Sequence, residues 1–183
     1  MTIETVLIVG GGLIGSSIAR AAKTYGQAEK VFISDNSSSA CETIERLGFA
    51  DGVAENAPEL YASQADLIIL CVPPGRIGEV AKAIIPVMKD EAILSDVGSI
   101  KGDVIKQVTP YLKETIHFVP GHPIAGTEYS GPEAGFAELF QERWCVLTPD
   151  DADESATEVV KTFWEGIGAL VAIMDSKLSL IHI

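Results

Sequence analysis

Residues 5–15 have the sequence TVLIVGGGLIG, and this stretch decides the fold. The nearly continuous apolar run at residues 5–9 is typical of a strand that is buried on both faces of a parallel sheet. Three glycines follow, and apolar residues then recur at helical spacing, at Leu13, Ile14, Ile18, Ala21 and Ala22. The stretch therefore predicts a strand, a glycine turn and a helix, in that order.

The glycine turn fits the pattern G-x-G-x-x-G at Gly10, Gly12 and Gly15, which is weak evidence by itself in a chain with 17 glycines. Its context strengthens it, because an acidic residue, Asp35, ends the next expected strand twenty positions after Gly15. In a dinucleotide site the three glycines permit a tight turn, a close approach of the backbone to the pyrophosphate, and packing of the helix on the strand. The helix N-terminus then offers free N–H groups to the phosphates.

Asp35 bears on the choice of dinucleotide. A carboxylate at this position can accept hydrogen bonds from ribose hydroxyls and repels a 2′-phosphate, and no Arg or Lys lies between Asp35 and Arg46. NAD is therefore favoured over NADP. Asp35 could instead cap the following helix, although the serines beside it can also do so. The expected cofactor-binding residues are Gly10, Gly12, Leu13, Ile14, Gly15, Asp35, Val72 and Pro73.

The alternation of apolar runs with helical patterns continues along the chain. Strands are expected at 30–34, 66–72, 92–97, 115–119, 144–148 and 169–174, with helices between most of them. Residues 120–132 are rich in glycine and proline, and we expect no regular structure there. The pattern predicts an α/β fold with a doubly wound, mostly parallel sheet of the Rossmann type over residues 1–174.

Two loops at the carboxyl ends of expected strands are candidates for substrate chemistry, because open α/β sheets bind ligands at that edge. The first holds Ser99 and Lys101, and the second holds His122, Thr127 and Glu128. A histidine with a near-neutral pKa suits proton abstraction, and Ser99 could hydrogen-bond a hydroxyl. The alternatives are that His122 is a structural donor and that Ser99 only caps the helix expected from Lys101.

Composition excludes several classes of function. The 183 residues carry 13 Lys and Arg against 26 Asp and Glu, a net charge of −13, which disfavours nucleic acid and anionic membranes as partners. Apolar runs are too short for a membrane helix, and the first residues show no signal peptide. The three cysteines are widely spaced, so we expect no metal site. Because neither a membrane helix nor a signal peptide is visible, we expect a soluble, cytoplasmic protein.

The sequence resembles the prephenate dehydrogenase family, which includes cyclohexadienyl and arogenate dehydrogenases. The resemblance rests on the glycine turn, Cys71-Val-Pro, the string DVGSIK at 96–101, GHPIAGTEYSG at 121–131 and Leu147-Thr-Pro. It implies NAD-dependent oxidative decarboxylation of prephenate or arogenate, a dicarboxylate substrate, in tyrosine biosynthesis. It also implies that His122 is the catalytic base, that Ser99 is an active-site residue, and that Thr127 and Glu128 lie in the substrate loop. A dicarboxylate needs cationic contacts, and Lys101, in the loop with Ser99, is the candidate cation.

The resemblance ends near Met174. Family members continue into a helical domain that closes the pocket and forms most of a homodimer, whereas residues 175–183 match nothing expected of that domain. We therefore expect a cofactor-binding domain with half an active site, inactive alone, followed by a short tail. The alternatives are a non-catalytic NAD-binding module and a different small-hydroxyacid dehydrogenase of the same fold.

Overall fold

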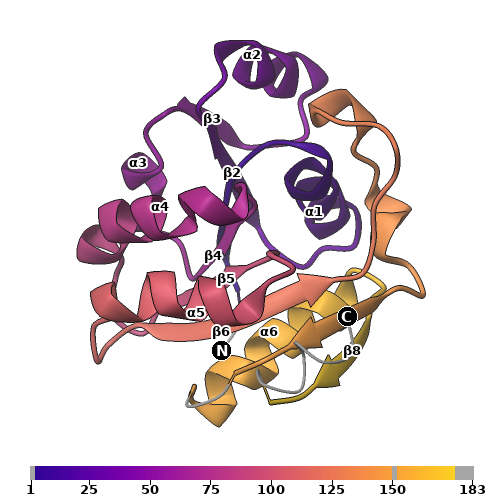
Figure 1. The fold of residues 1–183 in the computed structure, drawn as a ribbon. Helices are drawn as coiled ribbons and strands as arrows, with labels where there is room; N and C mark the ends of the chain where they lie inside the picture. The colour runs from indigo at the N-terminus through magenta and orange to yellow at the C-terminus, as the bar shows by residue number, and fades with distance from the viewer. Residues whose placement is uncertain (1–2, 150–151, 176–183) are drawn as a thin grey trace.

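The computed structural model describes residues 3–149 and 152–175 and contains one large sheet with helices on both faces (Figure 1). The strands of this part of the chain are β1 Thr5–Val9, β2 Lys30–Asp35, β3 Gly52–Glu55, β4 Leu67–Leu70, β5 Ile93–Asp96, β6 His117–Pro123, β7 Trp144–Leu147 and β8 Leu170–Ile173. The α-helices are α1 Leu13–Thr24, α2 Ser38–Leu47, α3 Glu59–Ala62, α4 Ile77–Ile84, α5 Lys101–Val108 and α6 Glu154–Gly166. Short 3₁₀ helices include Pro132–Ala134 and Ala137–Phe140.

The strand order is β3-β2-β1-β4-β5-β6-β7-β8. Neighbouring strands are parallel except β6 and β7, which are antiparallel. The chain winds outward from β1 in one direction through β2 and β3, and in the other from β4 onward. Such a reversal opens a crevice at the carboxyl ends of the two central strands, where α/β sheets bind ligands. The predicted doubly wound, mostly parallel architecture is confirmed.

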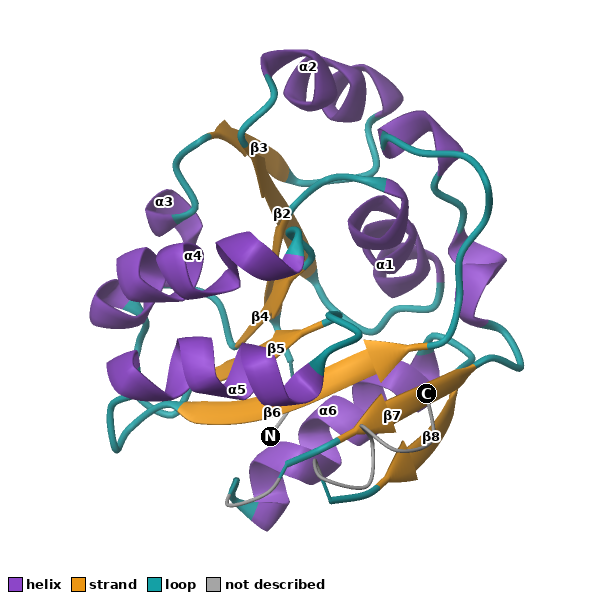
Figure 2. Ribbon diagram, viewed as in Figure 1, coloured by secondary structure: helices purple, strands orange, loops and turns teal. Residues whose placement is uncertain are grey.

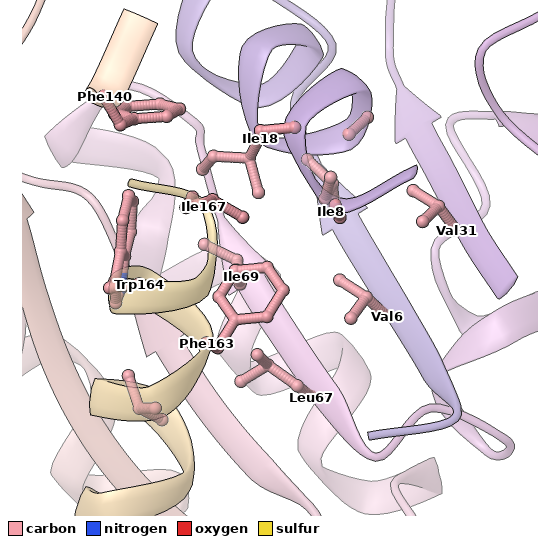
Figure 3. Close-up of a cluster of buried hydrophobic side chains, with 14 of the residues drawn as sticks. Val6, Ile8, Ile18, Val31, Leu67, Ile69, Phe140, Phe163, Trp164 and Ile167 are labelled. Carbon is pink, nitrogen blue, oxygen red and sulfur yellow. The ribbon is translucent and has the colours of Figure 1, made fainter. Parts of the chain in front are cut away.

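The helices divide the hydrophobic core between the two faces of the sheet (Figure 2). On one face, side chains of α1 and α6 pack against alternate residues of the central strands, and Figure 3 shows Ile18, Phe163 and Trp164 gathered around Ile8 and Ile69. On the other face, α4 and α5 cover the intervening residues, including Leu7 and Ile68. Because both faces are covered, β1 and β4 are buried along their whole length.

The far edge of the sheet is less covered. β8 is the last strand in the order, and Leu170 and Ile173 on it are about half exposed, as is Trp144 on the neighbouring β7. Most strands of a doubly wound sheet are buried on both faces, so this edge departs from the pattern of the centre.

Two features of the fold were not predicted. The short elements β3 and α3 lie in a stretch where the sequence showed no clear periodicity. The expectation of irregular structure from residue 120 was also wrong, because β6 continues through Pro120-Gly-His-Pro123. The prolines suggested a turn, but the extended chain is held by β7 through other groups: Thr148 N donates to Pro120 O at 3.0 Å and Ile124 N donates to Trp144 O at 2.7 Å.

We expect Gly15→Ala to destabilise the domain, because a Cβ at Gly15 would lie 1.9 Å from the backbone oxygen of Gly10. Overpacking of backbone against backbone should lower the free energy of unfolding by about 1–3 kcal/mol or more, despite alanine's better helix propensity. Urea unfolding followed by circular dichroism measures this change.

Gly12→Ala is the matched control, because a Cβ at Gly12 would meet nothing within 4 Å. It should change the free energy of unfolding by less than about 1 kcal/mol, the scale of a change at a helix N-cap. Equal losses of stability in the two variants would contradict the packing role assigned to Gly15.

Candidate functional site

A cavity of about 490 Å³ lies at the carboxyl ends of β1, β2 and β4, at the point where the winding of the sheet reverses. It is lined by the glycine turn, by the ends of β2 and β4 and by residues that follow β3. The lining residues are Val9, Gly10, Gly12, Ser34, Asp35, Asn36, Asn56, Pro58, Cys71, Val72, Pro73, Arg76 and Val80. This location and size are typical of a bound nucleotide.

The glycine turn brings the backbone of β1 against that of β4. Gly10 has φ +105°, and a Cβ there would lie 2.4 Å from Cys71 O, so only glycine fits. At Gly12 the space above the backbone is open, which would let a phosphate come close. α1 begins directly after Gly12 with no side-chain cap and no acidic residue in its first turn. Its free N–H groups and positive dipole end therefore suit an anionic group.

Asp35 ties the glycine turn to the end of β2. Its Oδ2 accepts from Gly11 N at 2.6 Å and its Oδ1 accepts from Ser37 N at 2.9 Å. The helix cap is Ser37, whose Oγ accepts from Ala40 N at 3.3 Å, so the alternative in which Asp35 caps α2 is wrong. Asp35 lines the cavity beside the turn, where a ribose would follow a pyrophosphate bound at α1.

The structure distributes the other expected cofactor residues unevenly. Val72 and Pro73 line the cavity, whereas Leu13 and Ile14 do not and instead open α1. Sequence reasoning missed Asn56 and Pro58, because they follow β3, a strand it did not predict. The positive φ of Asn56, 48°, marks the turn that carries it.

Arg76 also lines the cavity, and its Nε pairs with Glu79 Oε2 at 3.0 Å. Both side chains are largely exposed, with relative accessibilities of 55% and 69%, so this pair contributes little to stability. The arginine therefore lies at the rim of the cavity and remains free to reorient.

His122 lies within β6, opposite Val146 of β7, and is 9% exposed. Its Nδ1 has no hydrogen-bond partner among the described residues. Burial lowers the pKa of the imidazole, and the nearby charge of Lys101 lowers it further. The side chain is therefore held neutral at neutral pH, in the form that can accept a proton.

A second cavity, of about 620 Å³, lies beside His122. It is lined by His122, Pro123, Ile124, Ala125, Gly126, Thr127, Phe136, Glu138, Leu139, Gln141 and Arg143. Of the expected substrate-loop residues, only Thr127 reaches it; Glu128 is exposed and lines none of the cavities described. The structure thus brings His122 and Thr127 together and leaves Glu128 apart.

Ser99 is exposed in the loop between β5 and α5. The residue at the N-cap of α5 is Ile100, and no side chain caps this helix, so the alternative capping role of Ser99 is wrong. The hydroxyl is left available, although it makes no contact with His122 in this structure.

The expectation for Lys101 was wrong. The side chain is fully buried, and Nζ donates to Asp96 Oδ2 at 2.5 Å and to Gly121 O at 2.5 Å. A lysine whose ammonium is paired inside the protein cannot meet a substrate carboxylate. The sequence predicted a helix from Lys101, and Lys101 is the first residue of α5, but its side chain is directed into the space between β5 and β6 rather than toward solvent.

Comparison with known proteins identifies the family of this chain. Residues 18–173 match the family model described as prephenate dehydrogenase, nucleotide-binding domain. The chain belongs to this family. It is 40% identical over 173 residues to the cyclohexadienyl dehydrogenase of Zymomonas mobilis. The aligned region covers 94% of this chain and 58% of that protein. The prephenate dehydrogenase of Lactococcus lactis is 32% identical over 178 residues, covering 95% of this chain and 47% of that protein.

A solved structure of a prephenate dehydrogenase is also similar to this chain. Prephenate dehydrogenase from A. aeolicus, in complex with hydroxyphenyl propionate and NAD⁺, has a TM-score of 0.89 and 30% identity, over 98% of this chain and 62% of that chain. The chain spans about half the length of the two curated relatives that it matches. The expected resemblance to prephenate dehydrogenases is confirmed for the nucleotide-binding domain.

Among residues 3–149 and 152–175, no group of three or more His, Cys, Asp or Glu is arranged to hold a metal ion. Within the same residues, the helices are all too short or too polar to cross a bilayer.

We expect His122 to make the stability of the domain depend on pH. Its pKa in the folded state lies below the value of about 6.5 for an unfolded chain, so the unfolded state takes up the proton first as pH falls. The contribution of the neutral imidazole to the free energy of unfolding is complete above about pH 6.5. It is lost as pH falls below that value, at up to about 1.4 kcal/mol per pH unit. Urea unfolding between pH 5 and 7.5 measures it.

His122→Asn should flatten this pH dependence. An unchanged slope in the His122 variant would show that this imidazole is not the group that titrates.

Proposed function

We propose that this chain binds NAD in the 490 Å³ cavity and supplies the base for oxidative decarboxylation of prephenate or arogenate. The observation that carries the proposal is a buried His122 whose Nδ1 has no partner among the described residues, on the same carboxyl edge of the sheet as the nucleotide cavity. Burial also lowers the pKa of this imidazole, which favours its neutral form. Family membership supports the same reaction. The activity fits a cytoplasmic enzyme of tyrosine biosynthesis.

The residues have separate tasks in this reaction. His122 takes the proton of the ring hydroxyl, and its neutral form makes it competent to do so at neutral pH. The bound nicotinamide supplies the acceptor for the hydride from the carbon that bears this hydroxyl. Loss of the ring carboxylate as carbon dioxide then leaves an aromatic ring, which drives the reaction. The exposed Ser99 hydroxyl donates a hydrogen bond to the substrate, and Thr127 and Glu128 belong to the loop beside it.

The cations that hold the dicarboxylate must come mostly from elsewhere. Lys101 is paired inside the protein, and the domain carries a net charge of −13. We propose that the remaining part found in relatives supplies the missing wall of the pocket and the contacts of a homodimer. This chain alone then binds the cofactor without turning over substrate.

We expect the chain to bind NAD more tightly than NADP, because Asp35 lies where a 2′-phosphate would be placed and repels it. The double variant D35S/N36R should narrow or reverse this order, and isothermal titration calorimetry with both nucleotides measures it. Gly12→Ala should weaken both nucleotides about equally, because a new Cβ would fill the open space above the turn.

Asp35→Asn is the matched control for the charge. The amide has the size of the carboxylate, and its oxygen can still accept from Gly11 N, so the glycine turn is kept while the repulsion is removed; its NH₂ group gives up the bond from Ser37 N. It should bring the two affinities closer without favouring NADP. Equal affinities for NAD and NADP in the unmodified chain would remove Asp35 from the site.

The assigned reaction is tested in a chimera of residues 1–174 with the C-terminal part of the Zymomonas relative. It should form NADH when prephenate or arogenate is added, and His122→Asn should lower kcat by about 10²–10⁴, the scale for loss of a general base. Ser99→Ala should cost about 0.5–3 kcal/mol in kcat/KM, the scale of one hydrogen bond.

NAD affinity should stay within a few-fold in both variants, because the nucleotide cavity contains neither residue. The 183-residue chain alone serves as the reference and should show no turnover. If the chimera folds and binds NAD but oxidises only small hydroxyacids, the assigned substrate is wrong. Retention of full kcat by His122→Asn would remove the histidine from catalysis.

A further inference from the structure

A buried ion pair joins two residues that flank Ser99 in the sequence, and neither residue lines the nucleotide cavity or the cavity beside His122. Asp96, the last residue of β5, and Lys101, the first residue of α5, both have side chains with 0% exposure. Burying two charges costs several kcal/mol each, and apolar replacements of such pairs are often no less stable. Stability alone is therefore a weak explanation for this pair.

The hydrogen bonds of the pair converge on the backbone next to the candidate catalytic residues. Asp96 Oδ2 accepts from Gly98 N at 2.7 Å as well as from Lys101, and Asp96 Oδ1 accepts from Gly121 N at 3.4 Å. Lys101 Nζ donates to Gly121 O at 2.5 Å. Both backbone polar groups of Gly121 are thus bound by the pair.

Gly121 is also closely surrounded within the sheet. A Cβ at this position would lie 3.1 Å from Asp96 O and 3.3 Å from Leu147 Cδ2, tighter than ordinary contacts. Because the carbonyl that Lys101 binds belongs to the peptide joining Gly121 to His122, the orientation of that peptide is fixed. On the other loop, Ser99 lies between Gly98 and Lys101, two residues whose positions are set by Asp96.

We propose that Asp96 and Lys101 are positioning residues that hold the Ser99 loop and the Gly121–His122 peptide in one fixed relation. This inference rests on the proposed function, because it assigns roles to Ser99 and His122. The pair joins the end of β5 to β6 at the point where backbone pairing between them ends, since Asp96 is opposite Pro120 in the last register position. Beyond that position, this ion pair replaces the ladder.

The charges around His122 agree with this assignment. Burial raises the pKa of the Cys145 thiol, which accepts a hydrogen bond from the His122 backbone, so this neighbour is neutral. Burial raises the pKa of Asp96 and lowers that of Lys101, while their mutual attraction and hydrogen bonds oppose both shifts. Lys101 is the charged group that acts on His122, and it disfavours the imidazolium.

The test is NMR on the 183-residue chain carrying Lys101→Met, which keeps a long side chain and removes the charge. The pKa of His122 should rise, because a repelling cation is lost. Amide exchange at Gly121 should accelerate by about tenfold or more, the scale of one hydrogen bond, because Asp96, which accepts from Gly121 N, loses the ammonium that holds its carboxylate in place. The NAD dissociation constant should stay within about threefold, since the pair does not line the nucleotide cavity.

Lys161→Met is the matched control, because it removes the cation of an exposed pair with Glu158 on α6. It should change neither the titration of His122 nor exchange at Gly121. If Lys101→Met behaves in the same way, with both readouts as in the parent, the positioning role is overturned.

A second variant serves if Lys101→Met does not fold. Asp96→Asn keeps the size of the side chain, but its NH₂ group cannot accept from Gly121 N, so exchange there should again accelerate while a folded sheet is retained. Parent-like exchange would overturn the proposal.

In the active chimera, Lys101→Met should lower kcat with little change in KM for NAD. A chimera without turnover would contradict the proposed function and leave the NMR result standing.

Discussion

The close approach of Gly10 to the carbonyl of Cys71 is the constraint on which the site depends. No side chain fits between β1 and β4 at this point, because a Cβ at Gly10 would lie 2.4 Å from that oxygen. The contact lets the chain leave β1 at a positive φ and enter α1 directly, so that the helix N-terminus faces the crevice. The walls of the nucleotide cavity follow from this turn, since Asp35 is bound to it through Gly11 N.

The carboxyl edge of the sheet is organised into two parts with different electrostatics. The nucleotide part combines an uncapped helix N-terminus with a carboxylate, which suits phosphates and ribose hydroxyls respectively. The part around His122 is buried enough to keep the imidazole and the thiol of Cys145 neutral. The only fully buried ion pair among the described residues, Asp96 with Lys101, lies where β5 and β6 part.

The sequence predicted what depends on local pattern. Residues 5–15 carry both the apolar run and the glycine spacing, so the first strand, the glycine turn and the place of the nucleotide cavity could be predicted from them. The short β3 and α3 carry too few residues for a periodic signal, and the wall they provide, including Asn56 and Pro58, was missed with them. Lys101 was misplaced because its burial depends on Asp96 and Gly121, and the latter lies 20 residues further along the chain.

The error over residues 120–123 is the most instructive, because prolines are turn signals only when their neighbours lack partners. His122 belongs to a strand that is paired with β7, rather than to a mobile loop. A side chain on a paired strand keeps its place when the connecting segment changes. Insertions or substitutions in residues 124–131 can therefore reshape the cavity beside His122 without moving the imidazole. In the proposed reaction, the residues that select the substrate and the group that takes the proton would then change independently over evolution or in engineered variants.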